Sequence, residues 1–225
     1  MLGSPAVYVL DDDAAVRRGV SRLLQVAGFQ VSAHASAVDF MSALRTDAPG
    51  CLLLDLRMPD VSGLELLERL GEVAPLVGVV VMTGYGDVPS SVRAMKLGAV
   101  DFLSKPVSEA TLVDAIGSAL ERSSDRFRAR VEQEAVRARL SLLTRREREV
   151  CGLVAEGMLN KQIAGEIGTS EKTVKVHRAR VMSKLQVESV AQLVRLVDRA
   201  TMTKGKSARL PLPDPPSRLK ASPTV

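Results

Sequence analysis

The sequence predicts an α/β domain built on a doubly wound, five-stranded parallel sheet, joined by a helical linker to an all-α domain of four helices. A chain of 225 residues is long enough for two domains. In the first half, short apolar runs alternate with amphipathic stretches of helical length, which is typical of strands linked by crossover helices. Charge is uneven, because residues 1–120 carry 9 Lys and Arg against 14 Asp and Glu, whereas residues 121–200 carry 17 against 11. This asymmetry favours a regulatory or catalytic unit followed by one that binds a polyanion.

The strands and helices of the first half are predicted from these runs. The predicted strands are Ala6 to Leu10, Phe29 to His34, Cys51 to Leu54, Gly78 to Met82 and Val100 to Leu103. The predicted helices cover residues 14–27, 36–47, 62–72, 88–98 and 107 to about 120. Gly28 and Gly98 follow two of these helices, and glycine favours the left-handed conformation that often ends a helix.

The second half is helical. An Arg-rich helical pattern from Glu121 to about Leu140 predicts a linker helix, continuous with the preceding one or slightly broken. Further helices are predicted over residues 144–156, 161–167, 171–185 and 189–199, and Thr144 with Glu147 matches a capping box at the start of the first. The predicted domains are residues 1–120, a linker 121–139, a second domain 140–200 and a tail 201–225. The tail holds 5 of the 11 prolines and few core-forming residues, so disorder is expected there.

Composition excludes several classes of protein. Two cysteines, Cys51 and Cys151, and two histidines are too few for a disulfide framework or a zinc site. No apolar run is long enough to span a bilayer, so a cytoplasmic protein without membrane contact is expected. No aromatic residue follows Phe127, and aromatic side chains are what unpaired bases usually stack on. The polyanion expected for the basic half is therefore double-stranded DNA.

Acidic residues follow the predicted strands at the edge of the sheet where ligands of such folds collect. They and their neighbours are Asp11, Asp12 and Asp13 after the first strand, Asp55 after the third, Thr83 after the fourth and Lys105 after the fifth. Converging carboxylates repel one another unless a hard cation such as Mg²⁺ joins them. A carboxylate is also a nucleophile toward phosphorus, and a metal, an ammonium and a hydroxyl offset the charge of the transferred group.

Four segments resemble the signature segments of response-regulator receiver domains: VLDDD (9–13), LLDLRMPDVSG (53–63), VMTGYGD (81–87) and FLSKP (102–106). The resemblance implies a flavodoxin-like fold with Asp55 as the phosphoacceptor. It further implies Mg²⁺ held by Asp11, Asp12, Asp55 and the main-chain carbonyl of Arg57. Thr83 and Phe102 are the implied switch residues, Lys105 the implied contact to the phosphoryl group, and a cis bond is implied between Lys105 and Pro106.

Residues 160–185 have the layout of a helix-turn-helix: a short helix, a turn, and a longer recognition helix. On the longer helix, Val174, Val181 and Leu185 recur at helical spacing and should face the core. The side chains expected to point outward are Lys172, Thr173, Lys175, Val176, Ala179 and Arg180. Lys175 has the chemistry to reach guanine in a major groove and Val176 to touch a thymine methyl, while remaining cations mostly meet phosphates.

The segment from about Leu140 to Arg199 resembles the LuxR-type DNA-binding domain, through LTRREREV, NKQIAGEIG and TVKVHRARVMSKL. With the receiver it resembles the NarL/FixJ family, and its motif spacing is most similar to the FixJ subgroup. The implied DNA contacts are Lys175 and Val176 to bases and Lys161, Thr173, His177 and Arg178 to the backbone. Arg180, which should point outward, is expected to contact a phosphate. Ala179 stands where some members carry a base-reading cation. The final helix, with Val190, Leu193, Val194 and Val197, is implied to form dimers or to pack within its domain.

The function expected is that of a two-component transcription regulator. A sensor histidine kinase phosphorylates Asp55 with Mg²⁺ present, the protein forms a homodimer, and the dimer binds operator DNA, with RNA polymerase as a further candidate partner. One alternative is a Mg²⁺-dependent phosphatase with an aspartyl nucleophile, but Arg57 occupies the place of its second aspartate. Another is a binding module regulated without phosphate, which a missing Asp55, Thr83 or Lys105 would have favoured.

Overall fold

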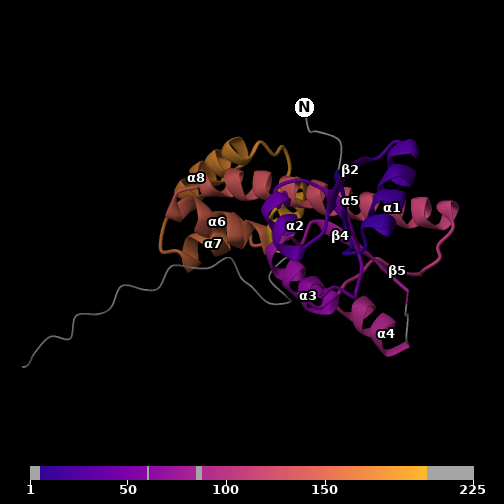
Figure 1. Ribbon diagram of the computed structural model, residues 1–225. Helices are drawn as coiled ribbons and strands as arrows, with labels where there is room; N and C mark the ends of the chain where they lie inside the picture. The colour runs from indigo at the N-terminus through magenta and orange to yellow at the C-terminus, as the bar shows by residue number, and fades with distance from the viewer. Residues whose placement is uncertain (1–5, 60, 85–87, 202–225) are drawn as a thin grey trace, which may run out of the picture. The chain divides into compact units, whose positions relative to one another are not determined.

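A computed structural model of the chain describes residues 6–59, 61–84 and 88–201. It divides into two compact units, Met1–Arg130 and Val131–Val225. The first unit holds a parallel sheet of strand order β2-β1-β3-β4-β5. Figure 1 labels its strands β2, β4 and β5. Its strands are β1 (Ala6–Leu10), β2 (Gln30–His34), β3 (Gly50–Leu54), β4 (Val77–Thr83) and β5 (Asp101–Ser104). The predicted sheet is confirmed, with strand ends within one or two residues of those expected.

Helices cover both faces of the sheet. They are α1 (Ala14–Val26), α2 (Ala37–Ala43), α3 (Gly63–Val73), α4 (Val88–Lys96) and the first part of α5 (Glu109–Ser141). Leu52 and Leu54 pack with side chains of α2, α3 and α4, whereas Leu53 packs on the other face with α1 and α5. Because both faces are buried, the central strands are continuous apolar runs rather than alternating ones.

The ends of the helices follow local chemistry. Gly28 and Gly98 have φ values of 91° and 97°, so the prediction that they end α1 and α4 is confirmed. Helix α2 is shorter than the predicted span of residues 36–47, because the chain turns extended at Leu44. The N–H of Arg45 donates to the Tyr8 hydroxyl at 3.2 Å instead of continuing the helical hydrogen bonds.

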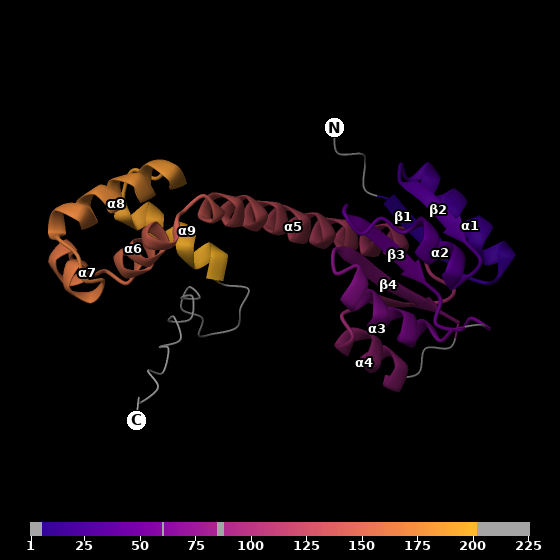
Figure 2. The ribbon, with the colours of Figure 1, turned by 90° about the vertical axis from the view of Figure 1, so that its left-hand side faces the viewer.

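Helix α5 is one uninterrupted helix of 33 residues (Figure 2). The alternative of a linker helix continuous with the last helix of the first domain is therefore the one observed. Past residue 120, α5 still packs on the first unit, because Ser123 is fully buried. Its Oγ accepts a hydrogen bond from the Gly50 N–H at 2.9 Å and donates to the Leu76 carbonyl. This serine therefore satisfies two backbone groups, one at the first residue of β3 and one directly before β4.

The approach of α5 to the sheet requires glycine at position 78. A Cβ atom there would lie 2.6 Å from the Ala119 carbonyl oxygen, a backbone atom with no freedom to move aside. We expect Gly78→Ala to lower the free energy of unfolding by about 2 kcal/mol, because α5 must shift from its packed position. Chemical denaturation measures this. Gly71→Ala in α3 is the control, since a Cβ there meets nothing within 4 Å, and it should leave stability unchanged or raise it because alanine favours a helix. A Gly78→Ala variant as stable as the wild type would contradict the prediction.

The second unit is helical. Besides the end of α5, its described helices are α6 (Arg145–Ala155), α7 (Asn160–Glu166), α8 (Glu171–Leu185) and α9 (Val190–Thr201). The predicted capping box is confirmed: the Glu147 N–H donates to Thr144 Oγ1 at 3.3 Å, and the Thr144 N–H donates to Glu147 Oε2 at 2.9 Å. The same oxygen accepts from Lys184 Nζ at 2.6 Å, so a carboxylate that is 3% exposed links α6 to the end of α8.

The remaining expectations concern sulfur, membranes and the tail. Cys51 and Cys151 are free and buried, and burial raises the pKa of Cys151 to about 11, so its thiol is neutral at pH 7. Within the described ranges, no helix is long and apolar enough to cross a bilayer. The predicted disordered tail, apart from Thr201, lies outside the described part of the chain.

Candidate functional site

Asp11 and Asp55 lie at the carboxyl ends of β1 and β3, which are neighbours in the sheet. The connections from these two strands leave in opposite directions, since β1 leads to β2 at the edge and β3 leads to β4. A ligand crevice forms at such a switch point in doubly wound sheets. Both side chains are buried, with exposures of 1% for Asp11 and 8% for Asp55.

Lys105 lies between the two carboxylates. It follows β5, and its Nζ donates to Asp11 Oδ2 at 2.7 Å and to Asp55 Oδ2 at 2.8 Å. Burial opposes the charged ammonium, but the hydrogen bonds and charges of Asp11 and Asp55 outweigh it and raise the pKa of Lys105. The lysine is therefore protonated at neutral pH and holds the two acidic groups together.

Three carboxylates meet at this place. Oxygen atoms of Asp11, Asp12 and Asp55 lie within 4.8 Å of one another, and Asp12 is exposed while the other two are buried. An all-oxygen donor set that is open on one side suits Mg²⁺, which is usually bound through one or two carboxylates and keeps several waters. The donor set therefore fits the metal that the sequence predicts, and the exposed side leaves room for phosphate oxygens.

The other residues expected at this site lie on β4, on β5 and in the segments that follow β3 and β5. Thr83 ends β4 and is 1% exposed, and its carbonyl accepts the Lys105 N–H at 2.8 Å. The Arg57 N–H donates to Asp55 Oδ1 at 3.2 Å. Phe102 is half-buried on β5. The bond between Lys105 and Pro106 is cis, as the resemblance implies.

The second candidate site is the exposed side of α8. Val174, Val181 and Leu185 are at most 1% exposed, so the predicted core face is confirmed. Lys175 and Val176 are exposed, as are Lys172, Ala179 and Arg180, while Thr173 is half-buried. Helix α7 and α8 thus have the arrangement of a helix-turn-helix with a polar, cationic outer side on its second helix.

The residues predicted to contact DNA differ in their exposure and in their interactions within the protein. Lys175 Nζ lies 3.6 Å from Glu171 Oε1 one turn earlier, a loose pair at the surface. Arg178 is half-buried, and its Nη1 donates to Asn160 Oδ1 on α7 at 3.0 Å. His177 is half-buried, and its Nδ1 is buried without a hydrogen-bond partner in the described part of the chain. Lys161 is exposed on α7.

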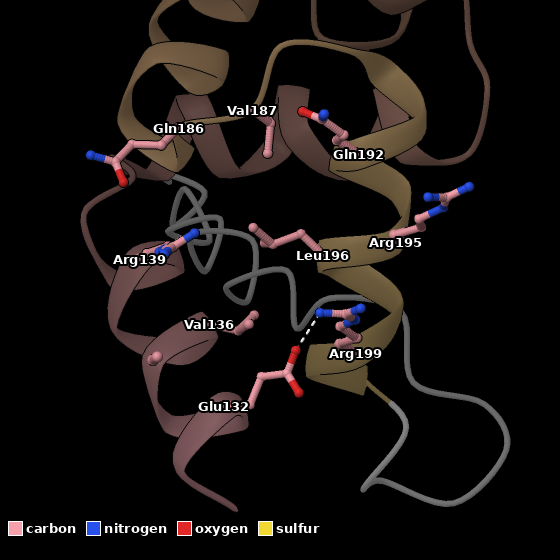
Figure 3. Close-up of a pocket in the computed structure, with 10 residues that line it drawn as sticks. Glu132, Val136, Arg139, Gln186, Val187, Gln192, Arg195, Leu196 and Arg199 are labelled. Carbon is pink, nitrogen blue, oxygen red and sulfur yellow. Dashed lines mark hydrogen bonds and ion pairs between the residues drawn. The ribbon is translucent and has the colours of Figure 1, made fainter. Parts of the chain in front are cut away.

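The last helix packs within its own unit. Leu193 and Val197 are 0% and 7% exposed and belong to the core of the second unit, as the intradomain alternative expects. A groove of about 500 Å³ lies between α9 and the C-terminal part of α5. In Figure 3, Val136 and Leu196 point into this groove, and Glu132 and Arg199 form an ion pair across it. The end of α5 is therefore part of the fold of the second unit.

The roles of two residues, Arg17 and Ser123, were not predicted from the sequence. Arg17 donates from Nη1 to the carbonyls of Asp11 and Asp12, at 2.7 Å and 3.2 Å, and Ser123 anchors α5 as described above. Ser123 had one signal, a small polar residue on the buried stripe of a helix. Arg17 had none, because an arginine in the first turns of an amphipathic helix is ordinarily a solvated surface residue.

Comparison with known proteins matches both units. Residues 7–117 match the response regulator receiver domain, and residues 141–197 match the bacterial regulatory proteins of the luxR family. The transcriptional regulatory protein FixJ of Azorhizobium caulinodans is 44% identical over 190 residues, which cover 84% of this chain and 90% of that protein.

Solved structures of the same organisation also match. A low-resolution structure of the response regulator StyR has a TM-score of 0.77 and 47% identity, over 87% of this chain and 98% of that chain. Full-length FixJ from B. japonicum has a TM-score of 0.54 and 42% identity, over 88% and 98%. The family that both units match is one of transcription regulators and not of enzymes, so the phosphatase alternative is wrong. The chain belongs to the FixJ-like response regulators, which join a receiver domain to a LuxR-type DNA-binding domain.

Proposed function

We propose that Asp55 is the phosphoacceptor and that Mg²⁺ binds at Asp11, Asp12, Asp55 and the carbonyl of Arg57. One observation carries this proposal: the Asp55 carboxylate lies at the switch point, hydrogen-bonded to Lys105 Nζ and within 4.8 Å of the other two acidic groups. Its oxygen is the nucleophile toward a phosphohistidine of the kinase. Lys105 offsets the negative charge of the transferred group, and Thr83 supplies a hydroxyl to it. A bound Mg²⁺ would add further positive charge at the same oxygens.

Phosphorylation adds charge at Asp55, and we propose that Thr83 and Phe102 pass this change to the surface. Helix α4 carries an exposed apolar stripe there, because Val88, Val92 and Met95 are 75%, 46% and 47% exposed. Single exposed apolar residues are common, but three at helical spacing favour a contact surface. This surface is the proposed face for pairing two receivers into a homodimer in the cytoplasm.

The proposed DNA-binding part is residues 140–200, following a receiver of residues 1–120 and a linker of 121–139. Helix α8 enters the major groove of double-stranded operator DNA, with Lys175 and Val176 at base edges. Lys161, Thr173, His177, Arg178 and Arg180 contact the backbone. The hydrogen bond between Arg178 and Asn160 supports a guanidinium that is positioned before DNA binds. RNA polymerase is a further proposed partner.

Mass spectrometry of the intact protein tests the phosphoacceptor. After incubation with acetyl phosphate and Mg²⁺, we expect one added phosphoryl group on the wild type and none on Asp55→Ala, because Asp55 is the nucleophile. Asp39→Ala, which removes an exposed carboxylate on α2, is the control and should be labelled like the wild type. Labelling of Asp55→Ala, or no labelling of the wild type, contradicts the proposal.

Lys175 and Arg180 test the recognition helix. We expect Lys175→Ala to weaken operator binding about tenfold or more and to relax base preference at one position of the operator. Arg180→Ala should weaken binding to all sequences alike and reduce the salt dependence by about one counterion. Fluorescence anisotropy with a duplex selected from a random pool measures both. Equal losses on selected and random duplexes for Lys175→Ala exclude a base contact.

A further inference from the structure

We propose that Arg17 is a positioning residue of the metal site, an inference that rests on the proposed function of Asp11, Asp12 and Asp55. Arg17 lies in α1 and is half-buried. Among the described residues, its guanidinium forms no hydrogen bond or ion pair with a carboxylate of Asp11, Asp12 or Asp55, so it does not neutralise their charge by direct contact. It instead binds the main chain of the loop that carries two of the three acidic side chains.

Two hydrogen bonds from a single guanidinium nitrogen define this contact. Nη1 of Arg17 donates to the Asp11 carbonyl at 2.7 Å and to the Asp12 carbonyl at 3.2 Å. The Arg17 N–H also donates to the Asp13 carbonyl at 2.9 Å. This last bond is the first backbone hydrogen bond of α1 and does not depend on the side chain, so the guanidinium itself binds the carbonyls of Asp11 and Asp12.

The rest of the loop fits this arrangement. The Asp13 N–H donates to Asp11 Oδ1 at 2.9 Å, and Asp13 Oδ1 caps α1 by accepting from the N–H groups of Ala15 and Val16. The cap determines where α1 begins, and α1 places Arg17 one turn later. Side chains of the loop and of the first turns of α1 therefore hold the loop in one conformation.

Asp12 is the group that depends most on these contacts. Its side chain is exposed, whereas those of Asp11 and Asp55 are buried. Burial and Lys105 restrain Asp11 and Asp55, and the Arg17 contact restrains the backbone that carries Asp12. Mg²⁺ demands near-ideal octahedral geometry. A loop that samples several conformations therefore lowers the affinity of the site for Mg²⁺.

Charge and positioning predict opposite effects of removing Arg17. If the guanidinium acted only as a positive charge near the cluster, its loss would strengthen Mg²⁺ binding, because one repelling cation is gone. If it positions the loop, its loss weakens binding. Arg18 lies next to it in the sequence and is exposed, so Arg18→Ala removes the same charge from α1 without touching the loop carbonyls.

Isothermal titration of Mg²⁺ into the full-length protein tests the proposal. We expect Arg17→Ala to raise the Kd for Mg²⁺ about tenfold, which is typical when a group that supports metal ligands is lost. Arg17→Lys should lie between Arg17→Ala and the wild type, and Arg18→Ala should bind like the wild type or more tightly. Labelling by acetyl phosphate is a second readout, in which Arg17→Ala needs more Mg²⁺ but reaches the wild-type rate when Mg²⁺ saturates.

The possible results distinguish the positioning role of Arg17 from the existence of the metal site. A Kd for Arg17→Ala equal to or below that of the wild type overturns the role of Arg17 and leaves the metal site in place. A wild type that binds no Mg²⁺ overturns both. A lower labelling rate of Arg17→Ala even at saturating Mg²⁺ also overturns the positioning role, because the loop would then act in the transfer step itself.

Discussion

We expect Lys105→Met to destabilise the metal-free receiver unit by about 3 kcal/mol at neutral pH. Lys105 Nζ is the hydrogen-bond partner of both Asp11 and Asp55, at 2.7 Å and 2.8 Å. Without the ammonium, two buried carboxylates face each other with no cation between them, and their mutual repulsion destabilises the folded state. Methionine fills a similar volume, so the loss reports the charge rather than a cavity.

Added Mg²⁺ should recover much of this loss, because the cation neutralises the same oxygens. Calorimetry in a chelator and then in Mg²⁺ measures both effects, and the transition that moves with Mg²⁺ identifies the receiver unit. Lys96→Met removes an exposed lysine from α4 and serves as the control. Equal stability of Lys105→Met and wild type in chelator would show that the two ion pairs contribute little.

We expect Glu147→Ala to destabilise the second unit by a comparable amount, about 3 kcal/mol. The carboxylate is 3% exposed and pairs with Lys184 at 2.6 Å. Its removal leaves the Thr144 N–H without an acceptor and takes away the link between α6 and the end of the recognition helix. Glu147→Gln should lose less, because the amide oxygen still accepts from Thr144.

The same group makes stability depend on pH. The hydrogen bond from Lys184 and those from Thr144 lower the pKa of Glu147 from 4.5 to about 2. Because the folded state has the lower pKa, the stabilisation is complete above about pH 4.5 and is lost as the pH falls toward 2. Wild type should therefore lose stability across this window more steeply than Glu147→Gln. Glu166→Gln, an exposed site on α7, should follow the wild type, and parallel profiles for all three would contradict the prediction.

The order of strands and helices in the receiver unit follows from local patterns. Each central strand is a continuous apolar run because both faces are covered, and glycines at Gly28 and Gly98 end two helices where the sequence predicts. The acidic residues were found from the same logic, since side chains that follow parallel strands must share one edge. The capping box at Thr144 and Glu147 is likewise a local signal that the structure confirms.

Contacts between distant residues were not predictable in the same way. The Arg45 N–H donates to the Tyr8 hydroxyl just past the end of α2, and no local pattern pairs these two residues. Lys184 reaches Glu147 across the second unit, although the sequence marks Glu147 only as part of a cap. Arg17 and Ser123 bind main-chain carbonyls, and carbonyls are present at every residue. Such partners become apparent only once the fold brings them together.

Ser123 bears on where this protein can be cut and rejoined. The Gly50 N–H and the Leu76 carbonyl are both satisfied by its hydroxyl, and Arg126 donates to the Pro75 carbonyl. A receiver fragment that stops at residue 120 lacks the turn of α5 that supplies these hydrogen-bond partners. Each backbone group that stays buried without a partner lowers the stability of the fragment. A chimera that joins this receiver to another DNA-binding module should therefore be joined after Arg126, because that junction keeps the hydrogen bonds that Ser123 and Arg126 make with the receiver.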